Sequence, residues 1–148
     1  MRLKDKRILI TGSTTGIGKA IARRCLKEGA RIFIHGLEED LALETSAELG
    51  DAPYQVSDLS GPAVPARLIR ETIAELGGLD GLVNNAGVVT RRQPPDMTLE
   101  LWDWTYAINV RAPFLLIQAA LGELASNRGR VVNIGSVNAY GGDRQSVV

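Results

Sequence analysis

A glycine-rich loop is the first feature of the chain whose residue types and spacing could do chemistry. Its glycines have the spacing G-x-x-x-G-x-G, between an apolar run at 7–10 and an amphipathic stretch that follows. Backbone N–H groups at a helix N-terminus, together with the positive end of the helix dipole, hold phosphate groups. The strand-turn-helix setting disfavours a flexible turn whose glycines arose by chance. We therefore expect a diphosphate site made by Gly12, Ser13, Thr14, Thr15, Gly16, Ile17 and Gly18.

Each glycine of this loop has a separate expected task. Gly12 turns the chain, Gly16 lets a phosphate approach the backbone, and Gly18 permits close packing of the helix on the strand.

Polar residues also follow three later apolar runs. Asp58 follows the run at 54–56, Asn85 follows the run at 81–84, and Ser136 follows the run at 129–135. Ligands bind at the carboxyl ends of parallel strands, so these side chains point toward one site. Taken singly, a polar residue in such a place is usually a turn residue or a helix cap.

Asn109 lies four residues before Pro113 in a helical stretch. A proline has no N–H to donate to the carbonyl four positions back, so the helix should kink and leave the Asn109 carbonyl free. The spacing alone does not distinguish a functional break from an irregular helical turn.

The elements that position these residues alternate between strand-length apolar runs and amphipathic stretches of helical period, which is typical of βαβ units. Strands are expected at 7–10, 30–35, 54–56, 81–84 and 129–135. Helices are expected at 17–29, 38–49, 62–76 and 98–125. The chain is thus predicted to be a single α/β domain over residues 1–148, with a doubly wound parallel sheet in a Rossmann-like three-layer sandwich.

Composition excludes several classes of function. Seventeen basic residues balance seventeen acidic ones, so no net field favours nucleic acid or an anionic membrane. One cysteine and one histidine allow neither a disulfide framework nor a recognisable metal motif, and we expect no metal. No run has the length of a membrane helix and the N-terminus does not look like a signal peptide, so a cytoplasmic location is expected.

Together these motifs resemble the short-chain dehydrogenase/reductase family over essentially the whole chain. The resemblance implies an oxidoreductase that moves hydride between NAD(P) and a secondary alcohol or ketone. It places Asp58 and Leu59 at the adenine. It also places Asn85, Ala86 and Gly87 where the dinucleotide crosses the sheet, and it makes Asn109 and Ser136 catalytic: Asn109 through a water on its carbonyl, Ser136 through the substrate oxygen.

The family's proton-transferring Tyr-x-x-x-Lys motif has no counterpart in the chain. In the family the Tyr follows the Ser by about thirteen residues, which is one position beyond Val148. Tyr140 is a poor substitute, because two glycines follow it and Arg144 stays charged. We therefore expect a fragment of a chain of about 250 residues, truncated after the fifth strand, with the apolar run at 114–117 uncovered. A non-catalytic nucleotide- or partner-binding protein and a non-functional product are the alternatives.

The family's cofactor markers are both absent. NADP-binding members carry a cation where this chain has Thr14, Thr15 and Leu37, and NAD-binding members carry Asp where it has Gly36. The absence of a cation weakens NADP binding more than the absence of an aspartate weakens NAD binding, so we expect NAD to be the preferred cofactor. Gly36 and Leu37 are included in the expected cofactor site. The substrate is expected to be a small alcohol or carbonyl compound, and the full-length form a homodimer or homotetramer.

Overall fold

A five-stranded parallel sheet forms the centre of the molecule in the computed structural model, which describes residues 1–137. The strand order is β3-β2-β1-β4-β5, and every neighbouring pair is parallel. The strands are β1 (Arg7–Ile10), β2 (Arg31–Gly36), β3 (Tyr54–Val56), β4 (Gly81–Asn84) and β5 (Arg130–Asn133). The helices are α1 (Gly16–Lys27), α2 (Glu39–Glu48), α3 (Val64–Leu76), α4 (Leu99–Tyr106) and α5 (Ala112–Ser126), with a 3₁₀ turn η1 (Pro94–Asp96) and a π-helical turn η2 (Ala107–Arg111).

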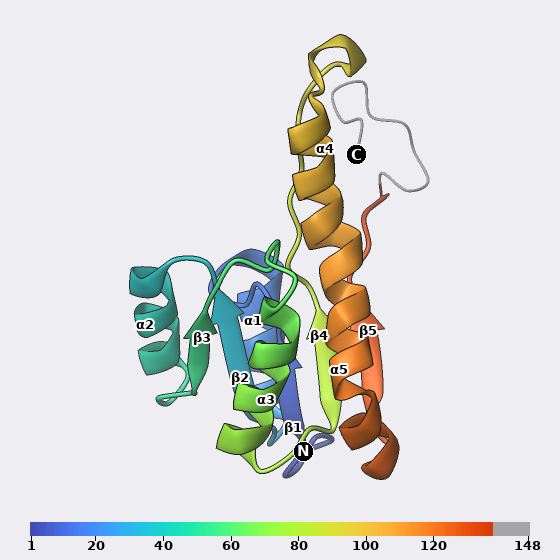
Figure 1. The fold of residues 1–148 in the computed structure, drawn as a ribbon. Helices are drawn as coiled ribbons and strands as arrows, with labels where there is room; N and C mark the ends of the chain where they lie inside the picture. Colours follow the sequence, from blue (N-terminus) through green and yellow to red (C-terminus); the bar gives the residue numbers. More distant parts are fainter. Residues whose placement is uncertain (138–148) are drawn as a thin grey trace.

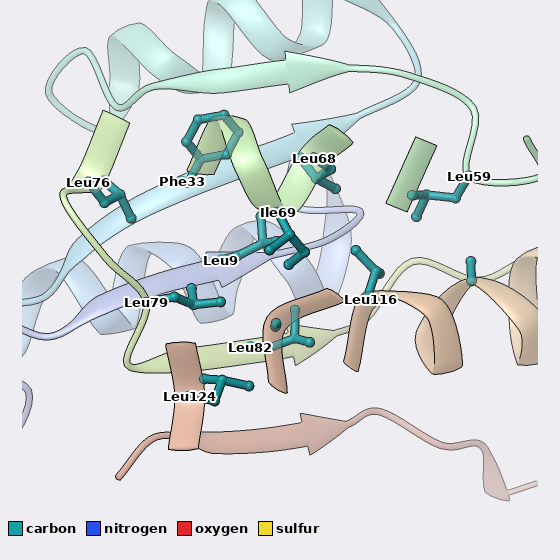
Figure 2. Close-up of a cluster of buried hydrophobic side chains, with 12 residues drawn as sticks. Leu9, Phe33, Leu59, Leu68, Ile69, Leu76, Leu79, Leu82, Leu116 and Leu124 are labelled. Atoms are coloured by element: carbon teal, nitrogen blue, oxygen red, sulfur yellow. The ribbon is translucent and has the colours of Figure 1, made fainter. Parts of the chain in front are cut away.

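Helices cover both faces of the sheet, so the predicted doubly wound α/β sandwich is confirmed (Figure 1). One buried cluster joins the sheet to α3 and α5 through residues such as Leu9, Leu68 and Leu116, as Figure 2 shows. A second cluster packs α1 against the opposite face through Ile8, Ile10, Ala22, Cys25 and others. The inner strands are apolar on both sides because each face is covered by helices.

The predicted elements match the observed ones to within about two residues, except over 98–125. That stretch was expected to be one helix, and it contains α4, the π-turn η2 and α5 in succession. A π-turn lengthens the hydrogen-bonded loop by one residue, which lets the helix pass Pro113 at the second position of α5 without a break in the ribbon (Figure 1). The kink that we expected at Asn109 therefore takes the form of a π-turn.

The apolar run at 114–117 was expected to be uncovered, and the structure shows that some of its side chains are exposed while others are buried. Phe114 is 60% exposed, whereas Leu116 is 1% exposed and belongs to the main core. The two residues lie on different faces of α5. All four residues of the edge strand β5 are exposed.

Candidate active site

The site forms where β1 passes into α1. Thr15, the N-cap residue of α1, makes no side-chain capping hydrogen bond, and the first turn of the helix contains no acidic residue. The positive end of the helix dipole is therefore not neutralised by the chain's own side chains in this turn. This arrangement suits an anion such as a diphosphate.

Two glycines of the loop are required by close approach of other backbone. Gly12 has a φ of +59°, and a Cβ there would lie 2.8 Å from the Cα of Ala86. A Cβ on Gly18 would collide with the carbonyl oxygen of Gly12. A larger residue at either position would push apart the glycine loop and the loop that follows β4.

Asn85 and Thr11 hold those two loops together. The Asn85 amide donates from Nδ2 to the carbonyl oxygens of Thr11 (3.0 Å) and Gly12 (2.9 Å). In return, the Thr11 hydroxyl accepts from the backbone N–H groups of Asn85 and Ala86, both at 3.0 Å. The Asn-Asn-Ala-Gly segment thus positions the glycine loop through hydrogen bonds, in addition to leaving room for a ligand.

A cavity of about 400 Å³ opens over the carboxyl ends of β1, β2 and β4, which is within the size range of ligand sites. Most of the residues predicted to bind the cofactor line it: Gly12, Thr14, Thr15, Gly16, Ile17, Gly18, Gly36, Leu37, Asp58, Leu59, Asn85, Ala86 and Gly87. The sequence prediction missed His35, Glu38, Leu41, Ser57, Val88 and Ile108, which also line it.

A second cavity, of about 650 Å³, adjoins the first and contains the two residues expected to be catalytic, Asn109 and Ser136. The cavities share five lining residues: Ile17, Asn85, Ala86, Gly87 and Val88. They therefore form one groove that crosses the carboxyl edge of the sheet, from the end of β2 to the end of β5.

Ser13 is the one predicted binding residue that the structure does not bring to the groove. It is fully buried; its hydroxyl donates to the Ile10 carbonyl at 2.7 Å, and its backbone N–H donates to the His35 carbonyl at 2.8 Å. The turn at Gly12 directs this residue inward, so it stabilises the loop from behind. The prediction of Ser13 as a cofactor contact is corrected accordingly.

Asn109 uses its side chain in a way the sequence did not indicate. Its Oδ1 accepts from the Val88 N–H at 2.9 Å, and its Nδ2 donates to the Val88 carbonyl at 2.8 Å. This pair of bonds fixes the loop after β4 to the π-turn. Both residues line the second cavity, so the bond sets the shape of its wall.

The end of β2 shows why the acidic residue typical of NAD-binding sites is absent. A Cβ on Gly36 would collide with the side chain of Thr14, so an aspartate does not fit there beside Thr14. Among residues 1–137, the lining of the cavity includes two acids, Glu38 and Asp58, and no Lys or Arg. Asp58 also has a local role, because its Oδ1 accepts from the Ser60 N–H at 2.8 Å.

No group of three or more His, Cys, Asp or Glu side chains within residues 1–137 is arranged to hold a metal ion. Among the same residues, no helix has the length and apolar character needed to cross a bilayer.

Comparison with known proteins decides the family. A sequence model described as short chain dehydrogenase matches residues 6–147. The chain belongs to this family. The short chain dehydrogenase fold is also seen in its structural neighbours: a Burkholderia cenocepacia short chain dehydrogenase in complex with NADP superimposes with a TM-score of 0.92 and is 33% identical, over 99% of this chain and 61% of that one.

Other members of the family show similar relationships. The chain is 38% identical to the uncharacterized oxidoreductase YvrD of Bacillus subtilis, over 92% of this chain and 53% of the relative. It is 38% identical to 2-(S)-hydroxypropyl-CoM dehydrogenase 3 of Xanthobacter autotrophicus, over 92% of this chain and 55% of the relative. A metagenomic blue fluorescent protein in complex with NADPH is 35% identical, with a TM-score of 0.91 over 99% of this chain and 62% of that one.

The chain thus spans about half the length of the relatives that it matches. Tyr140, which we weighed as a replacement for the family's tyrosine, lies outside the described residues.

Proposed function

We propose that this chain binds a nicotinamide dinucleotide along the groove, with the diphosphate at the start of α1. The observation that carries the proposal is the combination of an uncapped helix N-terminus with a glycine loop that Asn85 holds in place. Gly16 supports the fit, because the space beyond its Cα is empty and leaves room for a ligand oxygen to approach the backbone.

We further propose that the whole protein is an oxidoreductase acting on a secondary alcohol or ketone. The bound nicotinamide would supply the hydride acceptor or donor. Ser136, at the end of β5 in the second cavity, would donate its hydroxyl to the substrate oxygen and so orient the reacting carbon. Asn109 would act through its backbone carbonyl while its side chain holds Val88 in place.

Within the groove we propose a preference for NAD over NADP. The extra phosphate of NADP needs a cation. Among the described residues that line the first cavity, the side chains charged at neutral pH are two acids, Glu38 and Asp58. Glu38 stands at the N-cap of α2, two residues beyond Gly36, and would accept hydrogen bonds from the ribose hydroxyls in place of the missing aspartate. Two structural neighbours are in complex with NADP and NADPH, which is the opposite of the preference proposed for this chain.

Calorimetric titration of the 148-residue chain with NAD⁺ and NADP⁺ tests both proposals. We expect NAD⁺ to bind at least about tenfold more tightly, the effect of one charge-assisted contact. The variant Leu37→Arg should reverse the preference by adding a cation beside the 2′ position, while the matched variant Leu43→Arg, on the exposed surface of α2, should not. Tighter binding of NADP⁺ by the unmodified chain would overturn the NAD preference, and failure to bind either dinucleotide would overturn the binding site.

A nucleotide-binding protein without catalysis is the second candidate function. Dinucleotide binding without any turnover of secondary alcohols by the whole protein would favour it. Assembly into a homodimer or homotetramer remains a proposal, supported by exposed apolar side chains such as Phe114 and Leu121 on α5. A cytoplasmic location remains a prediction based on composition.

A further inference from the structure

His35 is a buried residue at the carboxyl end of β2 that the proposed function leaves without a task. It is 3% exposed, and it lines the first cavity together with Gly12 and Ser57. Its ring lies between the glycine loop and the loop that follows β3. Buried histidines require partners for both ring nitrogens, and this one finds them on those two loops.

The hydrogen bonds determine which nitrogen carries the proton. The Gly12 N–H donates to Nδ1 at 3.4 Å, so Nδ1 has no hydrogen. Nε2 is therefore protonated, and it donates to the Ser57 carbonyl at 3.0 Å or to the Ser57 hydroxyl at 3.2 Å. The neutral ring thus accepts from one loop and donates to the other.

A chain of further hydrogen bonds supports this orientation. The Ser57 hydroxyl donates to Oε1 of Gln55 at 3.0 Å, which leaves its lone pairs directed toward the ring. The Gln55 amide donates in turn to the carboxylate of Glu71 on α3. When Nε2 donates to the Ser57 hydroxyl, every bond of this chain has the same direction, from the Gly12 N–H through the ring to the carboxylate of Glu71.

The backbone of β2 also ties the ring to the glycine loop. The His35 N–H donates to the hydroxyl of Ser13 at 3.0 Å, and the Ser13 N–H donates to the His35 carbonyl. The main chain therefore places the ring beneath the Gly12 turn. The backbone of Gly12 has little freedom to move at that turn, because its φ is +59° and it lies close against Ala86.

We propose that His35 is a positioning residue for the dinucleotide site, and that its neutral ring, protonated on Nε2, orients the Gly12 turn through Nδ1 while anchoring it to Ser57. This inference rests on the proposed dinucleotide binding. His35 belongs to none of the motifs described above, and its role would be to shape the loop that faces the diphosphate.

The first test is direct because His35 is the only histidine in the chain. In a uniformly ¹⁵N-labelled 148-residue chain, every imidazole signal belongs to this ring. At pH 7 we expect the chemical shifts of a neutral ring with hydrogen on Nε2. A ring with hydrogen on Nδ1, or a mixture of tautomers, overturns the proposal whether or not a dinucleotide binds.

The second test uses two substitutions that differ in whether an acceptor atom remains near the position of Nδ1. His35→Asn keeps an acceptor oxygen near the position of Nδ1, whereas His35→Leu has similar bulk and leaves the Gly12 N–H unpaired. Calorimetry with ADP-ribose, which carries the adenosine and diphosphate, should give a Kd within about threefold of the unmodified chain for the Asn variant. The Leu variant should bind about tenfold more weakly or worse, the effect of leaving one buried donor unpaired.

Thermal unfolding of each variant shows that it is folded at the temperature of the binding assay. A role in stability alone would lower the Tm of both variants and leave the Kd of the folded protein unchanged, and that result overturns the proposal. Equal loss of affinity in the two variants also overturns it, since the acceptor atom would then be irrelevant. If the unmodified chain fails to bind ADP-ribose, the proposed function falls, and with it this role for His35.

Discussion

At the scale of single residues, the glycine loop is controlled by atoms that a side chain would displace. Gly18 lies against the carbonyl oxygen of Gly12 and the amide of Asn85. The Asn85 amide in turn is committed to two carbonyls of the loop. The position therefore tolerates no Cβ without movement of the groups that shape the diphosphate site.

Gly18→Ala should weaken NAD⁺ binding by at least about tenfold and lower the free energy of unfolding by about 1–3 kcal/mol, the typical cost of overpacking. Isothermal titration calorimetry and urea unfolding measure the two effects. Gly50→Ala is the matched control, because Gly50 has a φ of +72° with no neighbour in the way. It should cost about 1 kcal/mol of stability and leave affinity unchanged. Undiminished NAD⁺ affinity in Gly18→Ala would contradict the assignment of the loop.

Ser136 is a residue whose role is separable from binding, because it lies in the second cavity and not in the first. In a form of the protein that turns over substrate, Ser136→Ala should lower kcat by about a hundredfold or more, the usual effect of losing a donor to a reacting oxygen. The Kd for the dinucleotide should change by less than about twofold. Steady-state kinetics and calorimetry measure the two quantities.

The control for this change is Ser126→Ala, which removes an exposed hydroxyl at the end of α5 that donates to the Gly122 carbonyl of the same helix. It should leave kcat and Kd unaltered. A Ser136→Ala protein that no longer binds the dinucleotide would show that this serine belongs to the cofactor site.

At the scale of elements, the π-turn η2 carries the contact that shapes the substrate end of the groove. Asn109 satisfies both backbone groups of Val88 from this turn. In a regular helix, one fewer residue would separate α4 from α5, and the side chains beyond the turn would rotate by about 100° relative to those before it. The turn thus sets the direction of Asn109 relative to the loop after β4.

Asn109→Ala should free that loop. Since two hydrogen bonds are removed, we expect hydrogen exchange of the Val88 amide to accelerate at least about tenfold, and stability to fall by about 1–2 kcal/mol. Exchange followed by NMR measures the first effect. Val110→Ala, on the same turn with a side chain 54% exposed, should leave the Val88 amide protected. Equal exchange in Asn109→Ala and the unmodified chain would mean that other contacts hold the loop.

The elements themselves were largely predictable from the sequence, because strands covered on both faces form short continuous apolar runs and amphipathic helices repeat their apolar side chains every 3.6 residues. The π-turn was not, since periodicity cannot register a single inserted residue within a helical stretch. Pro113 indicated an irregularity at the right place, but a proline alone does not specify a π-turn in place of a kink.

Side-chain direction in loops was the other limit of prediction. Ser13 and Thr14 are neighbours in the glycine loop, yet Thr14 lines the cavity while Ser13 bonds Ile10 behind it. His35 carries no motif, and its place before Gly36 at the carboxyl end of β2 was the one available signal. The directions of Ser13 and Thr14 follow from the backbone angles at the Gly12 turn, which the sequence constrains only loosely.

At the scale of the whole molecule, the His35 ring is a buried polar group at the carboxyl edge of a sheet that has an apolar core on each face. Burial lowers the pKa of His35 from 6.5 to about 4, although the hydrogen bond to Ser57 and the charge of Asp58 act in the opposite direction. The ring therefore stays neutral in the folded protein at pH values where the unfolded chain would protonate it.

This difference predicts acid sensitivity of the fold. Because the unfolded ring binds a proton below pH 6.5 and the folded ring does not until about pH 4, the free energy of unfolding should be constant above pH 6.5 with respect to this group. It should fall between pH 6.5 and 4 by about 3 kcal/mol in total, and show no further loss from the ring below that range. Urea unfolding at half-unit pH intervals measures the profile.

The variant His35→Asn isolates this contribution, because it has no group that titrates at position 35. Carboxylates with lowered pKa values, such as Glu28 beside Arg2 and Arg24 and Asp80 beside Arg7, lose their stabilising charge as the pH falls below about 4.5 in both proteins. The difference in free energy of unfolding between the unmodified chain and the variant should therefore change between pH 6.5 and 4 and stay constant below pH 4. If the free energy of unfolding has the same slope against pH in both proteins over the upper interval, the ring takes up protons in the folded state as readily as in the unfolded chain. The buried ring with bonds to Gly12 and Ser57 would then be contradicted.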